Sequence, residues 1–192
     1  MMQAVYITDV IGEVVTAVKN QVLNTIQANE TEALGRETLI ETINYQKGHK
    51  RELLETLLQM DKSETNRYKK YPMVYLAQDF REEFNPTPGI YADTRLSIII
   101  CHQTKADYKV GERYDKVFKT VLYPIFNALI NQLFKHPQIH AQSPDTIKGV
   151  KWDRLYWGRQ AVGGVDATKL NDFVDAIEIE NLQLKFKNLS CF

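Results

Sequence analysis

The sequence lacks most of the features that place a chain in a specialised class. It has only two cysteines in 192 residues, Cys101 and Cys191, so neither a disulfide framework nor a cysteine-rich metal site is expected. Lysines and arginines together number 24, as do aspartates and glutamates, so no excess of positive charge exists to attract phosphate backbones. These absences disfavour secreted disulfide-rich proteins and general nucleic-acid binders, and they favour a reducing compartment.

Long apolar runs are also missing. No segment approaches the roughly 18 consecutive apolar residues of a membrane span, and the first ten residues lack a basic stretch followed by a long apolar one. We therefore expect no membrane partner and no secretory signal peptide, and we expect the protein to be cytosolic where it is made. Its 44% hydrophobic and 25% charged residues are ordinary for a globular protein, and its length suits one domain spanning residues 1–192.

Three stretches have the apolar spacing of amphipathic helices. They are residues 9–27, residues 50–61 and the long stripe of residues 112–134. Pro124 lies inside the last one and removes a backbone donor, which predicts a kink or break near Leu122.

Strands are predicted at residues 71–76, 91–102, 147–157 and 173–187. The second of these is apolar on both faces, so it should be central and covered on both sides. In the last one the apolar positions change from odd to even numbers, which requires a β-bulge near Glu180 and Asn181. Residues 81–89 and 158–172 are expected to be connections, and residues 40–48 are left as irregular structure or a short strand.

This order of elements predicts an α+β fold, an antiparallel sheet packed with one long and one or two shorter helices. Residues 37–66, which include the short helix, could be a helical insertion in this single domain.

Residues suited to catalysis do not form a recognisable motif. His136 and His140 have the spacing of a helical metal site, but Pro137 separates them and no accompanying glutamate is present. Asp172 and Asp175 are three apart at the start of a strand, where their side chains should diverge. We therefore assign no catalytic residue, no metal site and no cofactor.

Two basic clusters, residues 47–51 and 67–70, could contact nucleic acid, but with zero net charge a solvated or protein-binding surface is favoured. A denser group of aromatic and arginine side chains has the composition of a protein-interaction hot spot. We assign a subunit interface to this group and the glycine-bearing loop after it: Arg154, Tyr156, Trp157, Arg159, Gly163 and Gly164. An equally favoured interpretation is that one of the tryptophans, Trp152 or Trp157, belongs to the core and the rest to its rim.

Four segments together resemble structural proteins of phages and prophages of Bacteroidetes hosts, including crAss-like phages. They are KYPMVYL at residues 70–76, ER at 112–113 leading to VLYPIF at 121–126, DRLYWGR at 153–159 and NDFVDAIEI at 171–179. Their order is similar to that of tail terminator and neck proteins of tailed phages, and the resemblance covers most of residues 1–20 and 70–187.

The resemblance implies a non-enzymatic subunit of a homo-oligomeric ring in the virion, assembled in the cytoplasm of the host bacterium. Such a ring caps the tail tube or joins it to the head, contacts neighbouring neck and tail proteins, and leaves a channel through which DNA passes without sequence readout. Two alternatives from other classes stay open: a small soluble hydrolase built around His102 and Asp153, and a single-stranded nucleic-acid-binding protein.

Overall fold

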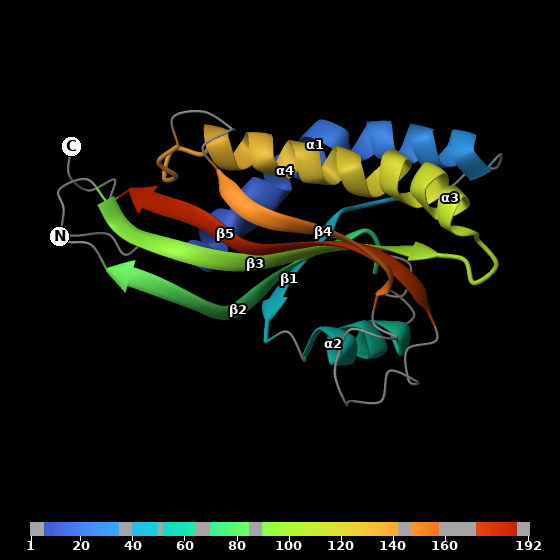
Figure 1. Ribbon diagram of the computed structural model, residues 1–192, viewed down its shortest axis with the longest axis horizontal. Helices are drawn as coiled ribbons and strands as arrows, with labels where there is room; N and C mark the ends of the chain where they lie inside the picture. The colour runs from blue at the N-terminus through green and yellow to red at the C-terminus, as the bar shows by residue number, and fades with distance from the viewer. Residues whose placement is uncertain are drawn as a thin grey trace.

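A five-stranded mixed sheet forms the centre of the computed structural model, which describes residues 6–34, 40–49, 52–63, 70–84, 90–141, 147–157 and 172–187. The strands lie in the order β1-β2-β3-β5-β4 (Figure 1). The short edge strand β1 runs parallel to β2, and all other neighbours are antiparallel. The strands are β1 (Asn44–Gly48), β2 (Met73–Phe84), β3 (Ile90–Thr104), β4 (Lys148–Trp157) and β5 (Phe173–Lys187).

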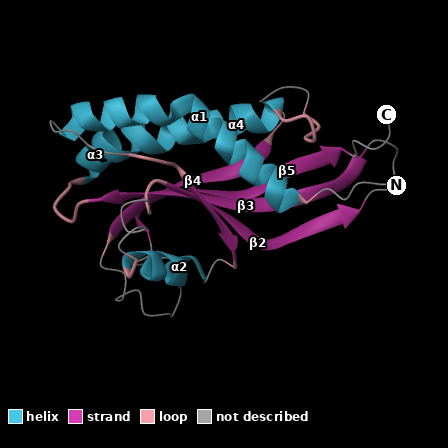
Figure 2. Ribbon diagram, turned by 180° about the vertical axis from the view of Figure 1, so that it is seen from behind, coloured by secondary structure: helices cyan, strands magenta, loops and turns pink. Residues whose placement is uncertain are grey.

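Two long helical segments cover one face of the sheet, as Figures 1 and 2 show from opposite sides. The first is α1 (Ile7–Leu34), and the second is a continuous run of α3 (Val110–Arg113), a π-helix (Tyr114–Leu122) and α4 (Tyr123–Lys135). A short helix, α2 (Glu52–Asp61), lies on the opposite face. The predicted α+β class, with one long and some shorter helices on a mostly antiparallel sheet, is confirmed.

The main core lies between the sheet and the long helices. Apolar residues of α1 recur every three or four positions and pack against alternate residues of the strands, as amphipathic elements should. From the central strands β3 and β5, the buried residues that face the helices include Leu96, Ile98, Ile100, Ile177 and Ile179.

A second, smaller core lies beneath α2. Leu53 and Leu57 of this helix pack against Ile99 and Cys101 of β3. The prediction that this strand is central and covered on both sides is therefore correct for its C-terminal half. Within the segment proposed as an insertion, residues 37–66, β1 forms an outer strand of this sheet and α2 packs on one of its faces.

The predicted bulge is present in β5. Ile98 pairs with Ile179 and Leu96 with Leu182, so β5 contains one residue more than β3 between these pairs. Asn181 lies in this step with a φ of 52°, a left-handed conformation that asparagine tolerates better than most residues. The bulge moves the apolar side chains from odd to even positions while they stay on the same face.

The proline in the long helix is accommodated by a change of helix type. The π-helical stretch ends at Leu122, and the amide of Tyr123 bonds to the carbonyl of Phe118, five residues back. Pro124 then occupies the first turn of α4, where its missing donor costs least. The kink or break expected near Leu122 is replaced by a π-to-α transition within a continuous helical run.

One predicted connection begins later than expected. Residues 81–84 belong to β2, where Arg81 pairs with Arg95 and Phe84 with Ala92. Their charged side chains resemble those of a loop, but the ladder with β3 continues beyond the irregularity between Ala77 and Arg81. None of the described helices is long and apolar enough to cross a membrane.

Candidate interaction surface

The strand β4 forms one edge of the sheet and pairs only with β5 among the described strands. Two of its apolar side chains, Val150 and Trp152, are each 45% exposed. An edge strand offers unpaired backbone groups, and exposed apolar side chains along it are a feature of association surfaces.

Trp152 belongs to a cluster that we term the β4 edge cluster: Trp152, Arg154, Glu178 and Glu180. The indole nitrogen Nε1 donates to a carboxylate oxygen of Glu180 at 3.2 Å, and the Nε of Arg154 donates to Glu178 at 3.1 Å. The guanidinium of Arg154 lies 4.8 Å from the centre of the Trp152 ring system. These contacts hold a large aromatic and an arginine in fixed positions, which reduces the entropy cost of binding a partner.

The remaining interface candidates separate into core residues and residues outside the described ranges. Trp157 is 1% exposed and packs in the core under α2 with Val174 and Ala176, so it presents no free surface. This agrees with the interpretation in which one tryptophan is core, and it identifies Trp152 as the exposed one. Arg159, Gly163 and Gly164 lie outside the described residues.

Tyr156 contributes to a buried polar network, not to an exposed patch. Its φ of 53° and a register irregularity between Arg154 and Trp157 turn its ring towards α3 and turn Trp157 towards α2. The guanidinium of Arg113 lies 3.6 Å from the centre of the Tyr156 ring. The network therefore anchors the end of β4.

Arg113 and Asp175 form the centre of this network, and both side chains are fully buried. The Nη1 of Arg113 donates to Asp175 at 2.8 Å, and the Tyr156 amide donates to the same carboxylate oxygen at 3.0 Å. Arg113 also donates to the backbone carbonyls of Tyr108 at 3.1 Å and Lys105 at 2.8 Å. This buried ion pair is a structural element, and no pattern in the sequence indicated that Arg113 and Asp175 would meet.

The residues considered for catalysis do not converge. His102 contacts Glu30 of α1 at 2.8 Å, whereas Asp153 accepts from Tyr123 and Lys151, each at 2.6 Å. Asp172 pairs with Lys70 and accepts from Gln103, and its neighbour Asp175 is turned towards Arg113. Within the described ranges, no three potential ligand side chains gather around a metal position.

The two histidines with metal-like spacing are also separated. His136 follows the end of α4 and contacts Glu13 of α1 at 3.1 Å, and the backbone amide of His140 bonds to β5. Glu13 and His136 thus tie the two long helices together.

A hollow of about 590 Å³ lies on the helix side of β4, between this strand and α4. We term it the α4–β4 groove. Its apolar lining includes the half-buried residues Phe126, Ile130 and Ile147. Lys151 lies at its wall, with its ammonium 4.7 Å and 5.6 Å from the ring centres of Tyr123 and Phe126.

A second hollow, of about 410 Å³, has a more charged lining, which includes Arg81, Arg95, Lys148 and Lys185. Arg81 pairs with Glu83 at 3.1 Å, and Lys185 lies 3.8 Å from Asp93. These two acidic neighbours compensate part of the positive charge of the lining.

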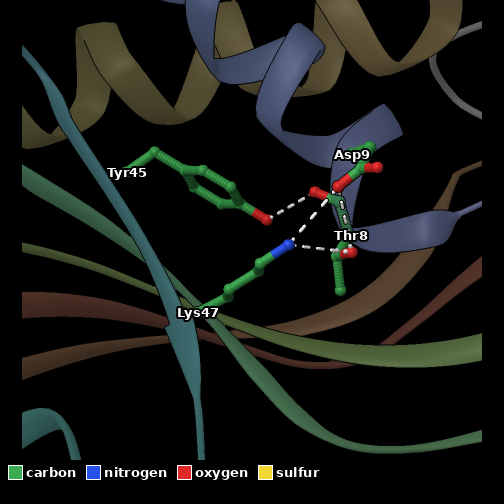
Figure 3. Close-up of polar contacts among 4 residues, drawn as sticks. All are labelled: Thr8, Asp9, Tyr45 and Lys47. Carbon is green, nitrogen blue, oxygen red and sulfur yellow. Dashed lines mark hydrogen bonds and ion pairs between the residues drawn. The ribbon is translucent and has the colours of Figure 1, made fainter.

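The other edge of the sheet, β1, is fastened to the start of α1 (Figure 3). The hydroxyl of Tyr45 donates to the carbonyl of Thr8 at 2.8 Å, and the ammonium of Lys47 bonds to the Thr8 hydroxyl at 3.1 Å and to Asp9 at 3.3 Å. Burial and the nearby Asp9 charge raise the pKa of Tyr45, so this hydroxyl stays a donor at neutral pH. The contact makes β1 and the first turn of α1 one rigid flank.

Strand alternation could have grouped Trp152 with Arg154 on one face of β4, but it could not have shown which tryptophan is exposed. Trp152 and Arg154 are two apart and share a face, whereas Lys151 and Asp153 point to the helices.

Comparison with protein-family models, curated proteins and solved structures gave no match, so the function is inferred from the molecule itself.

Proposed function

We propose that the protein is a virion structural protein of the phage neck or tail, a ring-forming tail terminator or head-to-tail joining subunit around a DNA channel. The observation that carries the proposal is the β4 edge cluster, which lies on the outer strand of the described sheet. The mostly antiparallel sheet and the long helices are compatible with the order of elements that the resemblance to neck and tail terminator proteins implies, which supports the proposal.

The chemistry of the cluster suits a protein partner. Tryptophan and arginine dominate interface hot spots because they combine large area with directional hydrogen bonds. Trp152 and Arg154 are held by Glu180 and Glu178, so the surface is both aromatic and charge-balanced. A charge-balanced aromatic surface fits another folded protein better than a polyanion.

The position of the cluster suits a ring. A subunit with two different contact surfaces on opposite sides makes head-to-tail contacts, which close into a ring when the rotation between copies permits. The two outer strands, β4 and β1, supply such opposite sides.

One observation favours the alternative of a single-stranded nucleic-acid-binding protein: Trp152 is exposed beside an arginine, and an exposed indole can stack on a base. The two glutamates of the cluster oppose it, since they would repel phosphates. Binding of an oligonucleotide, followed by Trp152 fluorescence at several salt concentrations, distinguishes the two functions: the ring proposal requires no steep salt-dependent quenching.

The proposal is tested by sedimentation of the purified full-length chain over a range of concentrations. We expect a concentration-dependent oligomer, and Trp152→Ala should weaken it by about 1–3 kcal/mol per interface while the monomer stays folded. Lys119→Ala is the control, because this exposed side chain pairs with Asp115 of the same helical segment. A monomer at every concentration, or equal loss in both variants, contradicts the proposal.

A further inference from the structure

A row of four polar side chains that can donate hydrogen bonds crosses four strands of the sheet. Arg81 of β2 lies directly opposite Arg95 of β3. Gln183 of β5 lies directly opposite both Arg95 and Lys148 of β4. We term these four residues the donor row. All four line the hollow of about 410 Å³ described above, which we term the charged hollow.

The donor row lies on the face of the sheet that is opposite to the long helices. Leu96 and Leu184, which are the next residues in β3 and β5, are buried in the core beneath those helices. Because side chains alternate between the two faces of a strand, Arg95 and Gln183 point the other way. On that face α2 packs against the C-terminal half of β3, and the side chains of the donor row remain exposed.

The charges of the donor row are incompletely compensated. Arg81 and Arg95 are like charges in directly opposite positions, an arrangement that destabilises a sheet. Arg81 is relieved by Glu83, at 3.1 Å. Within the described part of the chain, the side chains of Arg95, Gln183 and Lys148 have neither a hydrogen bond nor an ion pair. Three adjacent donors therefore face the hollow without an acceptor among the described residues.

The charged hollow has an excess of positive charge in a chain that is neutral overall. Its lining contains four arginines and lysines but only two carboxylates, Glu83 and Asp93, whereas the whole chain has 24 residues of each sign. One of the four cations, Lys185, lies 3.8 Å from Asp93, which is a long contact for an ion pair. A dianion would balance the excess.

The spacing of the strands allows the three unpaired donors to converge on one anion. Neighbouring strands lie about 4.8 Å apart, so the backbones of Arg95 and Lys148 are about 10 Å apart with Gln183 between them. The long side chains of arginine and lysine reach across half of that distance. An arginine offers two parallel N–H groups that match the geometry of a phosphate, and a lysine adds a compact positive charge.

We propose that the charged hollow binds the phosphate group of a small phosphate monoester. Arg95 and Lys148 contact the phosphate from either side, and the side-chain amide of Gln183 donates to it. The volume of about 410 Å³ is typical of small-molecule sites, so the rest of the ligand has room beside the phosphate. This binding site goes beyond the proposed ring function and does not depend on it.

A nucleic-acid strand fits the hollow less well than a single phosphate group. On one side of the donor row, Glu83 and Asp93 lie directly opposite each other. On the other side, Glu180 lies opposite Val150. These carboxylates would face the neighbouring phosphates of a continuous polyanion and repel them.

Calorimetric titration of the full-length chain with inorganic phosphate, at constant ionic strength, tests the site. We expect a dissociation constant of about 1 mM in the unmodified protein. Arg95→Ala and Lys148→Ala should each weaken binding by about tenfold or more, because hydrogen bonds to charged groups are the strong ones. Lys135→Ala is the matched control: Lys135 is an exposed lysine in the last turn of α4, outside the lining of the hollow, and its loss should leave binding unchanged.

A conservative variant and two further ligands refine the test. Arg95→Lys keeps the charge but loses the paired N–H groups, so its affinity should lie between those of the unmodified protein and Arg95→Ala. Phenyl phosphate, a small monoester, should bind at least as tightly as inorganic phosphate. A duplex oligonucleotide and a polyglutamate peptide, at the same concentration of anionic groups, should bind more weakly than phenyl phosphate.

The outcomes decide for or against the site. Loss of phosphate binding in Arg95→Ala and Lys148→Ala, with normal binding in Lys135→Ala, would support it. No binding at about 10 mM phosphate, or equal affinity in all variants, would overturn it. Tighter binding of the oligonucleotide would overturn the small ligand in favour of a nucleic acid, and tighter binding of the peptide would overturn it in favour of an acidic protein segment.

Discussion

Replacing Arg113 with methionine tests the buried network that anchors the end of β4. The substitution keeps an unbranched apolar side chain, shorter than that of arginine, and removes the charge. It breaks the bond to Asp175 and those to the carbonyls of Tyr108 and Lys105, and it removes the stacking on Tyr156. Because Asp175 is fully buried, its carboxylate would be left without a counter-charge.

The expected cost follows from that uncompensated charge. Breaking a buried ion pair by removing one partner typically destabilises a protein by about 3–5 kcal/mol. With a urea m value of about 2 kcal/mol/M, the unfolding midpoint should fall by about 2 M. Urea titration followed by circular dichroism measures this shift.

A double variant separates the charge effect from simple loss of packing. Adding Asp175→Asn to Arg113→Met removes the buried charge but keeps an oxygen that accepts from the Tyr156 amide. The double variant should therefore be more stable than Arg113→Met alone. Lys119→Ala, in an exposed pair with Asp115, should change stability by less than about 0.5 kcal/mol. A cost below about 1 kcal/mol for Arg113→Met, or additive losses in the double variant, would refute the reasoning.

Three further predictions concern the bulge, alkaline pH and the two tryptophans. Asn181→Val should destabilise the protein by about 1–2 kcal/mol because a β-branched residue is strained at a φ of 52°, whereas Asn181→Gly should be tolerated; thermal melting compares them. Burial raises the pKa of the Cys101 thiol to about 12, and burial together with the charges of Glu52 and Asp79 raises the pKa of Tyr75 to about 12. Both groups ionise more readily in the unfolded chain, so the stability of the fold should fall as the pH rises above about 9. An unfolding midpoint that is constant between pH 8 and pH 11 would contradict this. Trp157→Ala should cost about 3–5 kcal/mol of folding stability, and Trp152→Ala should leave the melting temperature of the dilute monomer nearly unchanged.

Local periodicity was sufficient to predict most of the elements. The spacing of apolar residues located the helices and β5, and the change of phase in β5 located the bulge at Asn181. These patterns depend on burial of one face, which is encoded in neighbouring residues. Residues 81–84 were assigned to a connection because the ladder that extends β2 depends on its distant partner β3.

The surface was harder to predict than the fold. Composition identified the aromatic and arginine segment of β4, but it could not decide which tryptophan is exposed. That decision depends on the irregularity at Tyr156, which follows from a contact with Arg113, 43 residues away in the chain. Likewise, the α4–β4 groove exists only because two elements separated in sequence lie side by side.

The central claim is that copies of this chain form a closed ring, and electron microscopy of the purified full-length protein at increasing concentration tests it most directly. The account predicts closed rings of uniform size with a central channel that admits double-stranded DNA. Monomers at every concentration, or compact dimers without a channel, would contradict it.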